Sequence, residues 1–125
     1  MDDVLLPKNA VQIIRGTSKT LVVTTTDSKG KPIDLTGARV IMTVKGRVED
    51  TQNVFQKTTD VLTQVEVTDP KAGIAQIYIS PSDTQTQEIK TYVFDVWVVL
   101  TSGKRYAAVP PSLFDIQPGV TILSP

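Results

Sequence analysis

The stretch TYVFDVWVVL, from Thr91 to Leu100, carries the strongest strand signal in the chain. β-Branched and aromatic residues dominate it, and these residue types favour a pleated, extended backbone. Successive side chains of a strand point to opposite faces, so the stretch has two apolar faces, broken only by Asp95. One face carries Tyr92, Phe94, Val96 and Val98, and the other carries Val93, Trp97 and Val99. This pattern predicts a central strand that is covered on both sides, or on one side by a partner.

The first residues of this stretch also point to a particular kind of β-sandwich. Many immunoglobulin-like domains place a tyrosine near the start of the sixth strand, two positions before an inward residue. The hydroxyl of that tyrosine bonds back to the preceding backbone. Tyr92 and Phe94 have this spacing, and they follow a polar loop. Phe94 would then stand where antibody domains have a cystine.

The rest of the chain repeats short alternating segments, separated by turn signals about every 8 to 12 residues. We expect strands in 11–15, 20–26, 38–46, 61–68, 73–80 and 105–109, the last ending at Pro110 and Pro111. The polar segment 47–60 is expected to be an edge strand or a long loop. One helical turn is predicted near 81–87, with Pro81 in its first turn after Ser80. The predicted fold is all-β, a single immunoglobulin-like antiparallel β-sandwich of about seven to nine strands over residues 1–125.

Composition excludes several classes of function. The chain has 13 basic and 13 acidic residues and a formal charge of zero, so it lacks the electrostatic footprint of a nucleic-acid binder. It has no cysteine and no histidine, which removes thiolate chemistry, the commonest metal ligand and the usual general base. No apolar run is long enough to span a membrane, and the acidic start does not resemble a secretory leader. A neutral surface gives little repulsion between copies and suits a homo-oligomer or a larger assembly.

No residue pattern indicates an active site or a cofactor. The serine–lysine pair Ser102 and Lys104 sits in a predicted hairpin turn, where a solvated lysine is the simpler interpretation. The acidic pairs at 2–3 and 49–50 lack the regular spacing of a calcium loop, and Lys29 and Lys31 stand where such a loop needs acids. We therefore expect a protein that is not an enzyme and that holds no metal or cofactor.

Trp97 is the residue with two competing interpretations. It is either a tryptophan of the sandwich core or partly covered sheet face, or the centre of an apolar patch, with Val93, Val99 and Tyr106, that docks a partner. The lone carboxylate of Asp95 fits a polar-rimmed face better than a sealed core.

The two ends of the chain carry aliphatic residues outside the main strand set. Segments 1–10 and 118–125 include Leu5, Leu6, Ile122 and Leu123. As extended arms, they would add strands to the open sheet edges of neighbouring molecules. Alternatively, they complete the sheets of their own domain. The sequence leaves both interpretations open.

A series of turns and strands resembles the immunoglobulin-like module of tailed-bacteriophage structural proteins, and is similar to the amino-terminal domain of siphophage baseplate upper proteins. The resemblance covers about residues 11–114. It is carried by Gly16 and Thr17, by Asp27, Gly30 and residues 32–38 (PIDLTGA), by Asp69, Pro70 and Gly73, and by Tyr92, Phe94, Asp95 and Val96.

The resemblance implies a non-enzymatic virion component, made in the cytoplasm of the host bacterium and held in the particle by protein–protein contacts. Baseplate members of this group continue into receptor-binding or oligomerising regions, which the sequence here does not include. The resemblance therefore favours an accessory, adaptor or decoration piece of a capsid, head-tail junction or tail. Its expected partners are other virion proteins in multiple symmetric copies, without direct contact to nucleic acid or membrane. The alternative is an adhesive module that recognises a carbohydrate or protein on the host cell surface.

Overall fold

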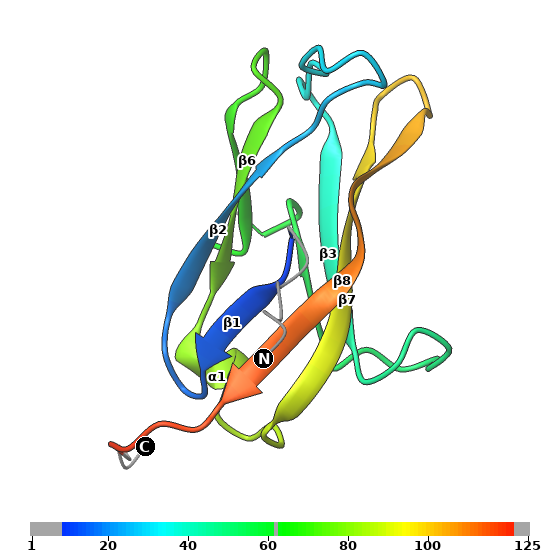
Figure 1. Cartoon of the computed structure of the whole chain (residues 1–125). Coiled ribbons are helices and arrows are strands. Elements are labelled where there is room, and N and C mark those ends of the chain that lie inside the picture. Colours follow the sequence, from blue (N-terminus) through cyan, green and yellow to red (C-terminus); the bar gives the residue numbers. More distant parts are fainter. Residues whose placement is uncertain (1–8, 62, 122–125) are drawn as a thin grey trace, which may run out of the picture.

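The computed structural model describes residues 9–61 and 63–121, which form eight β-strands and one short helix in two layers (Figure 1). In chain order the elements are β1 (Val11–Ile14), β2 (Lys19–Thr24), β3 (Arg39–Lys45), β4 (Phe55–Thr58), β5 (Val65–Asp69), β6 (Ile74–Ile79), α1 (Pro81–Thr84), β7 (Lys90–Val99) and β8 (Arg105–Gln117).

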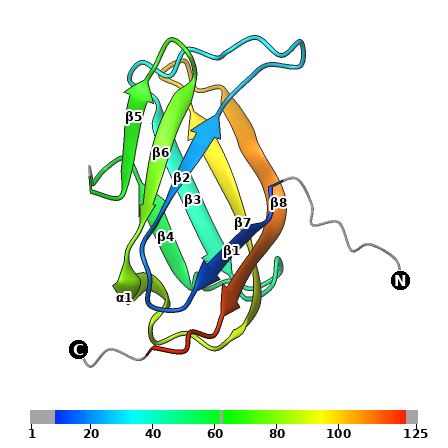
Figure 2. The same ribbon diagram turned by 60° about the vertical axis from the view of Figure 1, so that its left-hand side comes forward.

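The strands form two sheets that pack face to face. The five-stranded sheet has the order β1-β8-β7-β3-β4, and the three-stranded sheet has the order β2-β6-β5. Figure 2 shows β5, β6 and β2 as one layer lying across β3, β7 and β8. The three-stranded sheet corresponds to the B, E and D strands of an immunoglobulin domain, and β3, β7 and β8 correspond to its C, F and G strands. The immunoglobulin-like sandwich predicted from the sequence is confirmed. One strand pair was not predicted, since β1 pairs with β8 in parallel.

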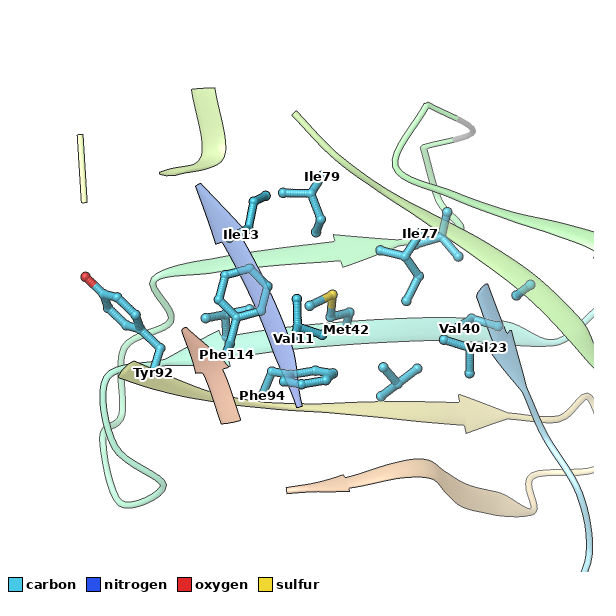
Figure 3. Close-up of a cluster of buried hydrophobic side chains, with 14 of the residues drawn as sticks. Val11, Ile13, Val23, Val40, Met42, Ile77, Ile79, Tyr92, Phe94 and Phe114 are labelled. Carbon is cyan, nitrogen blue, oxygen red and sulfur yellow. The ribbon is translucent and has the colours of Figure 1, made fainter. Parts of the chain in front are cut away.

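The inward side chains of the two sheets form one hydrophobic core. Every second residue of β3, β6 and β7 is buried, as the alternating patterns predicted. Figure 3 shows side chains from both sheets meeting in this core, among them Met42, Ile77 and Phe94. The ring of Phe114 meets the rings of Phe55 and Phe94 edge to face, with centroids 5.7 and 6.0 Å away. Such pairs contribute roughly 0.5–1.5 kcal/mol beyond their buried area.

Tyr92 forms the expected tyrosine corner. Its ring is buried at the start of β7, and its hydroxyl donates a hydrogen bond of 2.8 Å to the carbonyl oxygen of Glu88 in the preceding loop. Burial raises the pKa of Tyr92, and the negative charge of Glu88 adds to that rise. The corner holds the loop before β7 against the end of the core.

The helical turn α1 begins after Ser80, with Pro81 as its first residue, as predicted. The Asp83 carboxylate accepts a hydrogen bond of 2.7 Å from the Ser80 amide, and its Oδ2 lies 2.6 Å from Nζ of Lys57. The side chains of Lys57 and Asp83 are only 6% and 15% exposed. This buried ion pair joins the edge strand β4 of one sheet to the turn that follows β6 of the other. No helix among the described residues has the length and hydropathy of a membrane span.

Two predicted strand boundaries are wrong. The strand predicted to end at Pro110 continues through both prolines to Gln117, because a β-bulge accommodates them. Phe94 pairs with Ser112 and Val96 pairs with Val109, so two prolines lie opposite the single residue between Phe94 and Val96. Prolines are tolerated in strands at bulges, where the ladder does not need their missing N–H groups.

The other wrong boundary is the strand predicted over 61–68, which begins only at Val65 as β5. The carbonyl oxygen of Val61 instead accepts hydrogen bonds from the amides of Gln64 and Val65, which makes the preceding residues a turn. Local turn bonding therefore replaces the first half of the predicted ladder, and Val61 is exposed.

Candidate functional site: the outer face of the five-stranded sheet

The outward side chains of β3, β7 and β8 form a mixed apolar and charged surface, here called the outer face. Residues that lie directly across an antiparallel pair share a face, so the strand register fixes its rows. One row across the three strands contains Ile41, Trp97 and Ala107. A second row across the same strands contains Lys45, Val93 and Leu113. Between them lies a pair formed by Thr43 and Asp95.

Trp97 lies at the centre of the outer face. Its side chain is 44% exposed, and its indole Nε1 donates a hydrogen bond of 3.1 Å to Oδ2 of Asp95 two residues earlier. This contact accounts for the carboxylate that interrupts the apolar face of β7, because Asp95 satisfies the indole N–H while it remains at the surface. The structure places Trp97 on the sheet face and not in the core, which agrees with a partly covered sheet-face residue, and the docking of a partner on Trp97 stays a prediction.

The outer face is hollowed beside Trp97. The hollow has a volume of about 300 Å³ and is here called the outer-face groove. Its walls are mainly apolar, with one lysine and one carboxylate at the surface. They are formed by Ile41, Thr43, Lys45, Val48, Val93, Phe94, Asp95, Trp97 and Pro111. A concave apolar surface with a few polar groups is the usual form of a binding site.

The groove gathers some of the predicted contact residues and separates others. Val93 and Trp97 both line it. Val99 lies on the same face, at the end of β7, where it pairs with Arg39 on one side and Arg105 on the other. Tyr106 pairs with Val98, whose side chain is fully buried, and so belongs to the inner face. The predicted patch of Trp97 with Tyr106 is therefore wrong.

Sequence reasoning did not predict most of the groove residues, among them the polar Thr43 and Lys45 and the apolar Ile41, Val48 and Pro111. Ile41 lies across from Trp97, but only the pairing of β3 with β7 brings the two together. Val48 is exposed in the polar loop after β3, and Pro111 was expected to lie beyond the end of its strand. The exposed valine in an otherwise polar loop was the one local signal that could have indicated a contact.

The predicted arm residues fall largely outside the described residues. Leu5 and Leu6 lie in 1–8, and Ile122 and Leu123 lie in 122–125, which the structure does not describe. Of the described arm residues, 9–10 and 118–121 belong to no strand, and Val120 is fully exposed. The sheet of this domain begins at Val11, directly after the first predicted arm.

A second, polar hollow lies at the end of the sandwich near the tyrosine corner. Its volume is about 550 Å³. It is lined by amide and charged side chains of the loop after β3 and the loop before β7, together with Tyr92. These include Asp50, Gln52, Asn53, Gln87, Glu88 and Lys90. Such groups can donate and accept hydrogen bonds in several directions.

The titratable groups with shifted pKa values are scattered and have local causes. Hydrogen bonds from the hydroxyl and amide of Thr36 lower the pKa of Asp34. A hydrogen bond to Glu66 raises the pKa of Tyr78, and partial burial adds to that rise. The Asp34 pair and the Tyr78 pair lie on different loops and strands, so they do not converge on one site.

The serine–lysine pair and the acidic pair at 49–50, which were considered as catalytic or calcium sites, lie in turns. Ser102 and Lys104 lie in the exposed hairpin turn between β7 and β8. Asp50 accepts a hydrogen bond of 3.0 Å from the Arg47 amide, and both Glu49 and Asp50 lie 3.7 Å from the Arg47 side chain. Within residues 9–61 and 63–121, no three acidic residues come together as a metal site would require.

No protein-family model matches the chain, and no curated protein matches it.

Proposed function

We propose that the chain is a bacteriophage virion structural protein. It would act without catalysis, as an accessory, adaptor or decoration component of a capsid, head-tail junction, tail or baseplate. The observation that carries this proposal is the outer-face groove, which has Trp97 as one of its walls. Half-exposed tryptophan beside a concave apolar surface is typical of an anchor in a protein–protein interface. The motif series from Gly16 to Val96 supports the assignment to a phage particle.

The mechanism would be assembly through many weak contacts. In a symmetric particle, each copy is held by several neighbours at once, so the effective concentration of each contact is high. A groove of about 300 Å³ accommodates a few side chains of a partner, which is enough for one anchor in such an arrangement. The exposed Val120 would supply a further contact.

Particle composition tests the proposal. Phage particles induced from the bacterium that carries the gene would be purified on a density gradient, and their proteins identified by mass spectrometry. We expect the chain in the particle band at a fixed ratio to the major structural proteins. Its absence from intact particles would refute the assignment.

A matched pair of variants tests the role of the groove. Val93→Asp places a charge in the groove, whereas Val22→Asp places the same charge on an exposed valine of β2, on the other sheet. We expect Val93→Asp to lose incorporation into particles and Val22→Asp to retain it. Equal incorporation of both variants would show that the groove takes no part in assembly.

The second candidate function is an adhesive module for the host cell surface, and the polar hollow favours it. Amide and carboxylate side chains such as Asn53, Gln87 and Glu88 suit the hydroxyl groups of a carbohydrate. Binding of the purified chain to host cell walls, lost in Asn53→Ala with Gln87→Ala and kept in Val93→Asp, would favour adhesion over assembly.

A further inference from the structure

The strand β2 has a free edge with a regular backbone. It is an outermost strand of the three-stranded sheet, and among the described strands β6 is its only neighbour (Figure 2). All six residues of β2, from Lys19 to Thr24, pair with β6 in one unbroken register. The side of β2 that faces away from β6 is therefore an uninterrupted row of backbone groups.

The hydrogen-bond pattern of the ladder shows which groups lie in that row. The amide of Thr25 donates a hydrogen bond of 2.8 Å to the carbonyl oxygen of Gly73, and these two residues continue the register of β2 with β6. In an antiparallel pair, opposite residues that bond each other alternate with opposite residues that do not. The amides and carbonyl oxygens of Thr20, Val22 and Thr24 therefore point away from β6. Within the part of the chain that the structure describes, no backbone group bonds to them from that side.

The other three outermost strands carry features that discourage pairing with another molecule. β1 and β4 have only four residues each, and β4 turns the charged side chain of Lys57 inward. β5 has an irregular register between Val67 and Asp69 and is followed by Pro70. Short strands, bulges, prolines and inward charges are the usual means by which proteins protect a sheet edge. β2 has none of them, and Lys19 at its start is its only charged residue.

The sequence of β2 is complementary to that of a second copy. A two-fold axis beside Val22 would place Val22 opposite Val22 of the second copy and Thr20 opposite Thr24. These are the residues with free backbone groups, and each such pair exchanges two hydrogen bonds. Their side chains share the exposed face of the sheet, where Val22 is 63% exposed, and β-branched pairs across strands stabilise a sheet. Lys19 would lie opposite Thr25, so no like charges face each other across the pair.

From these observations we propose that β2 is a dimerisation edge, at which two copies of the chain join their three-stranded sheets into one continuous antiparallel sheet. The pairing is closed by its two-fold axis, so it gives a dimer and not a growing filament. β2 and the outer-face groove belong to different sheets, so the dimer leaves the groove accessible. The proposal therefore does not depend on a role in a virion.

A disulfide tests the register of the dimer, because the protein has no cysteine of its own. Val22→Cys places the two thiols on directly opposite residues, with Cα atoms about 5.5 Å apart, a distance that a disulfide can bridge. The matched control is Thr20→Cys, on the same exposed face of the same strand. In the proposed register its two copies lie about 13 Å apart along the strands. On mild oxidation we expect a disulfide-linked dimer of Val22→Cys and at most a trace of one for Thr20→Cys. Equal yields of the two variants would overturn the proposal.

Sedimentation velocity of the full chain tests the pairing of the backbones. We expect a concentration-dependent equilibrium between monomer and dimer. Thr20→Pro removes a free amide at an edge position where proline is tolerated, and should shift the equilibrium to monomer. The control Thr20→Val keeps this amide and should keep the dimer. Val22→Lys leaves the backbone intact and places like charges opposite each other, so it should also lose the dimer. A wild-type chain that stays monomeric, or a dimer that survives both Thr20→Pro and Val22→Lys, would overturn the proposal.

Discussion

The two faces of β7 have nearly the same apolar content and different surroundings. The inner face carries Tyr92, Phe94, Val96 and Val98, which are buried against the three-stranded sheet. The outer face carries Val93, Trp97 and Val99, which are covered in part or exposed, and Trp97 satisfies its N–H group with Asp95. The comparison shows that apolar alternation identifies a strand, while the polar residue that interrupts one face identifies which face remains at the surface. Substitutions on the inner face should therefore lower the stability of the fold. Substitutions on the outer face should instead weaken the binding of a partner.

The largest contrast is expected between two adjacent residues of β8. Phe114→Ala removes a fully buried ring that two other phenylalanines contact, and should lower the free energy of unfolding by about 4 kcal/mol. Leu113→Ala removes an exposed side chain of the outer face and should cost less than about 1 kcal/mol. Urea unfolding measures both. Similar losses for the two variants would contradict the assignment of the faces.

A buried charge on the inner side should give the next largest effect. Asp83→Ala leaves Lys57 buried without its partner and should destabilise the fold by about 3 kcal/mol. The matched control is Asp60→Ala, because the ion pair of Asp60 with Arg39 is exposed, and this change should cost less than about 1 kcal/mol.

A double substitution separates a lost attraction from a stranded charge. Lys57→Met together with Asp83→Ala removes both charges, and it should recover most of the stability that Asp83→Ala loses. Urea unfolding of all the variants at two salt concentrations gives the comparison. If the double variant is no more stable than Asp83→Ala, the buried lysine is not the source of the loss.

The tyrosine corner should give a smaller effect that depends on pH. Tyr92→Phe removes the hydrogen bond to Glu88 and should cost about 1 kcal/mol at neutral pH. The pKa of Tyr92 is raised in the folded state, so the neutral phenol favours folding. That contribution is complete below the unfolded pKa of about 10 and is lost as the pH rises through the folded pKa. The difference between wild type and Tyr92→Phe should therefore narrow above about pH 10, measured by urea unfolding. A constant difference would contradict the assignment.

The smallest effect on stability is expected at the centre of the outer face. Trp97→Ala removes a half-exposed side chain and its cross-strand contact with Ile41, at a cost of at most about 1 kcal/mol. Urea unfolding measures this cost, and the same change should reduce incorporation of the chain into phage particles if Trp97 is an anchor of the proposed interface. A loss of stability as large as that of Phe114→Ala would place Trp97 in the core after all.

The parts of the fold that were predictable depend on local periodicity. Tyr92 and Phe94 gave the corner and the inner face of β7, because a spacing of two residues fixes the side of a strand. The helical turn at Pro81 was predictable for a similar reason, since proline sets the backbone angle of a first helical residue. Each of these predictions required only neighbouring residues.

The parts that failed depend on pairing between distant strands. The pairing of β8 with β7 is irregular on both sides of Val109. Residues of β8 before and after this point therefore do not face the sides of the sheet that an unbroken alternation predicts. Ala107 therefore lies across from Trp97, and Tyr106 faces inward. Lys57 is a second case, because its inward position is stabilised by Asp83, 26 positions further along the chain. Periodicity within one segment carries no information about a bulge or a distant counter-ion.

The two prolines of β8 also affect how copies of the domain behave when they are crowded. The edge of β8 before Phe114 has no strand partner among the described residues, and a bare edge can recruit the edge of another molecule. Pro110 and Pro111 interrupt the row of donors that such recruitment needs. Copies can therefore be concentrated side by side without their sheets fusing across this edge into a continuous fibril, and each sandwich keeps its own boundary.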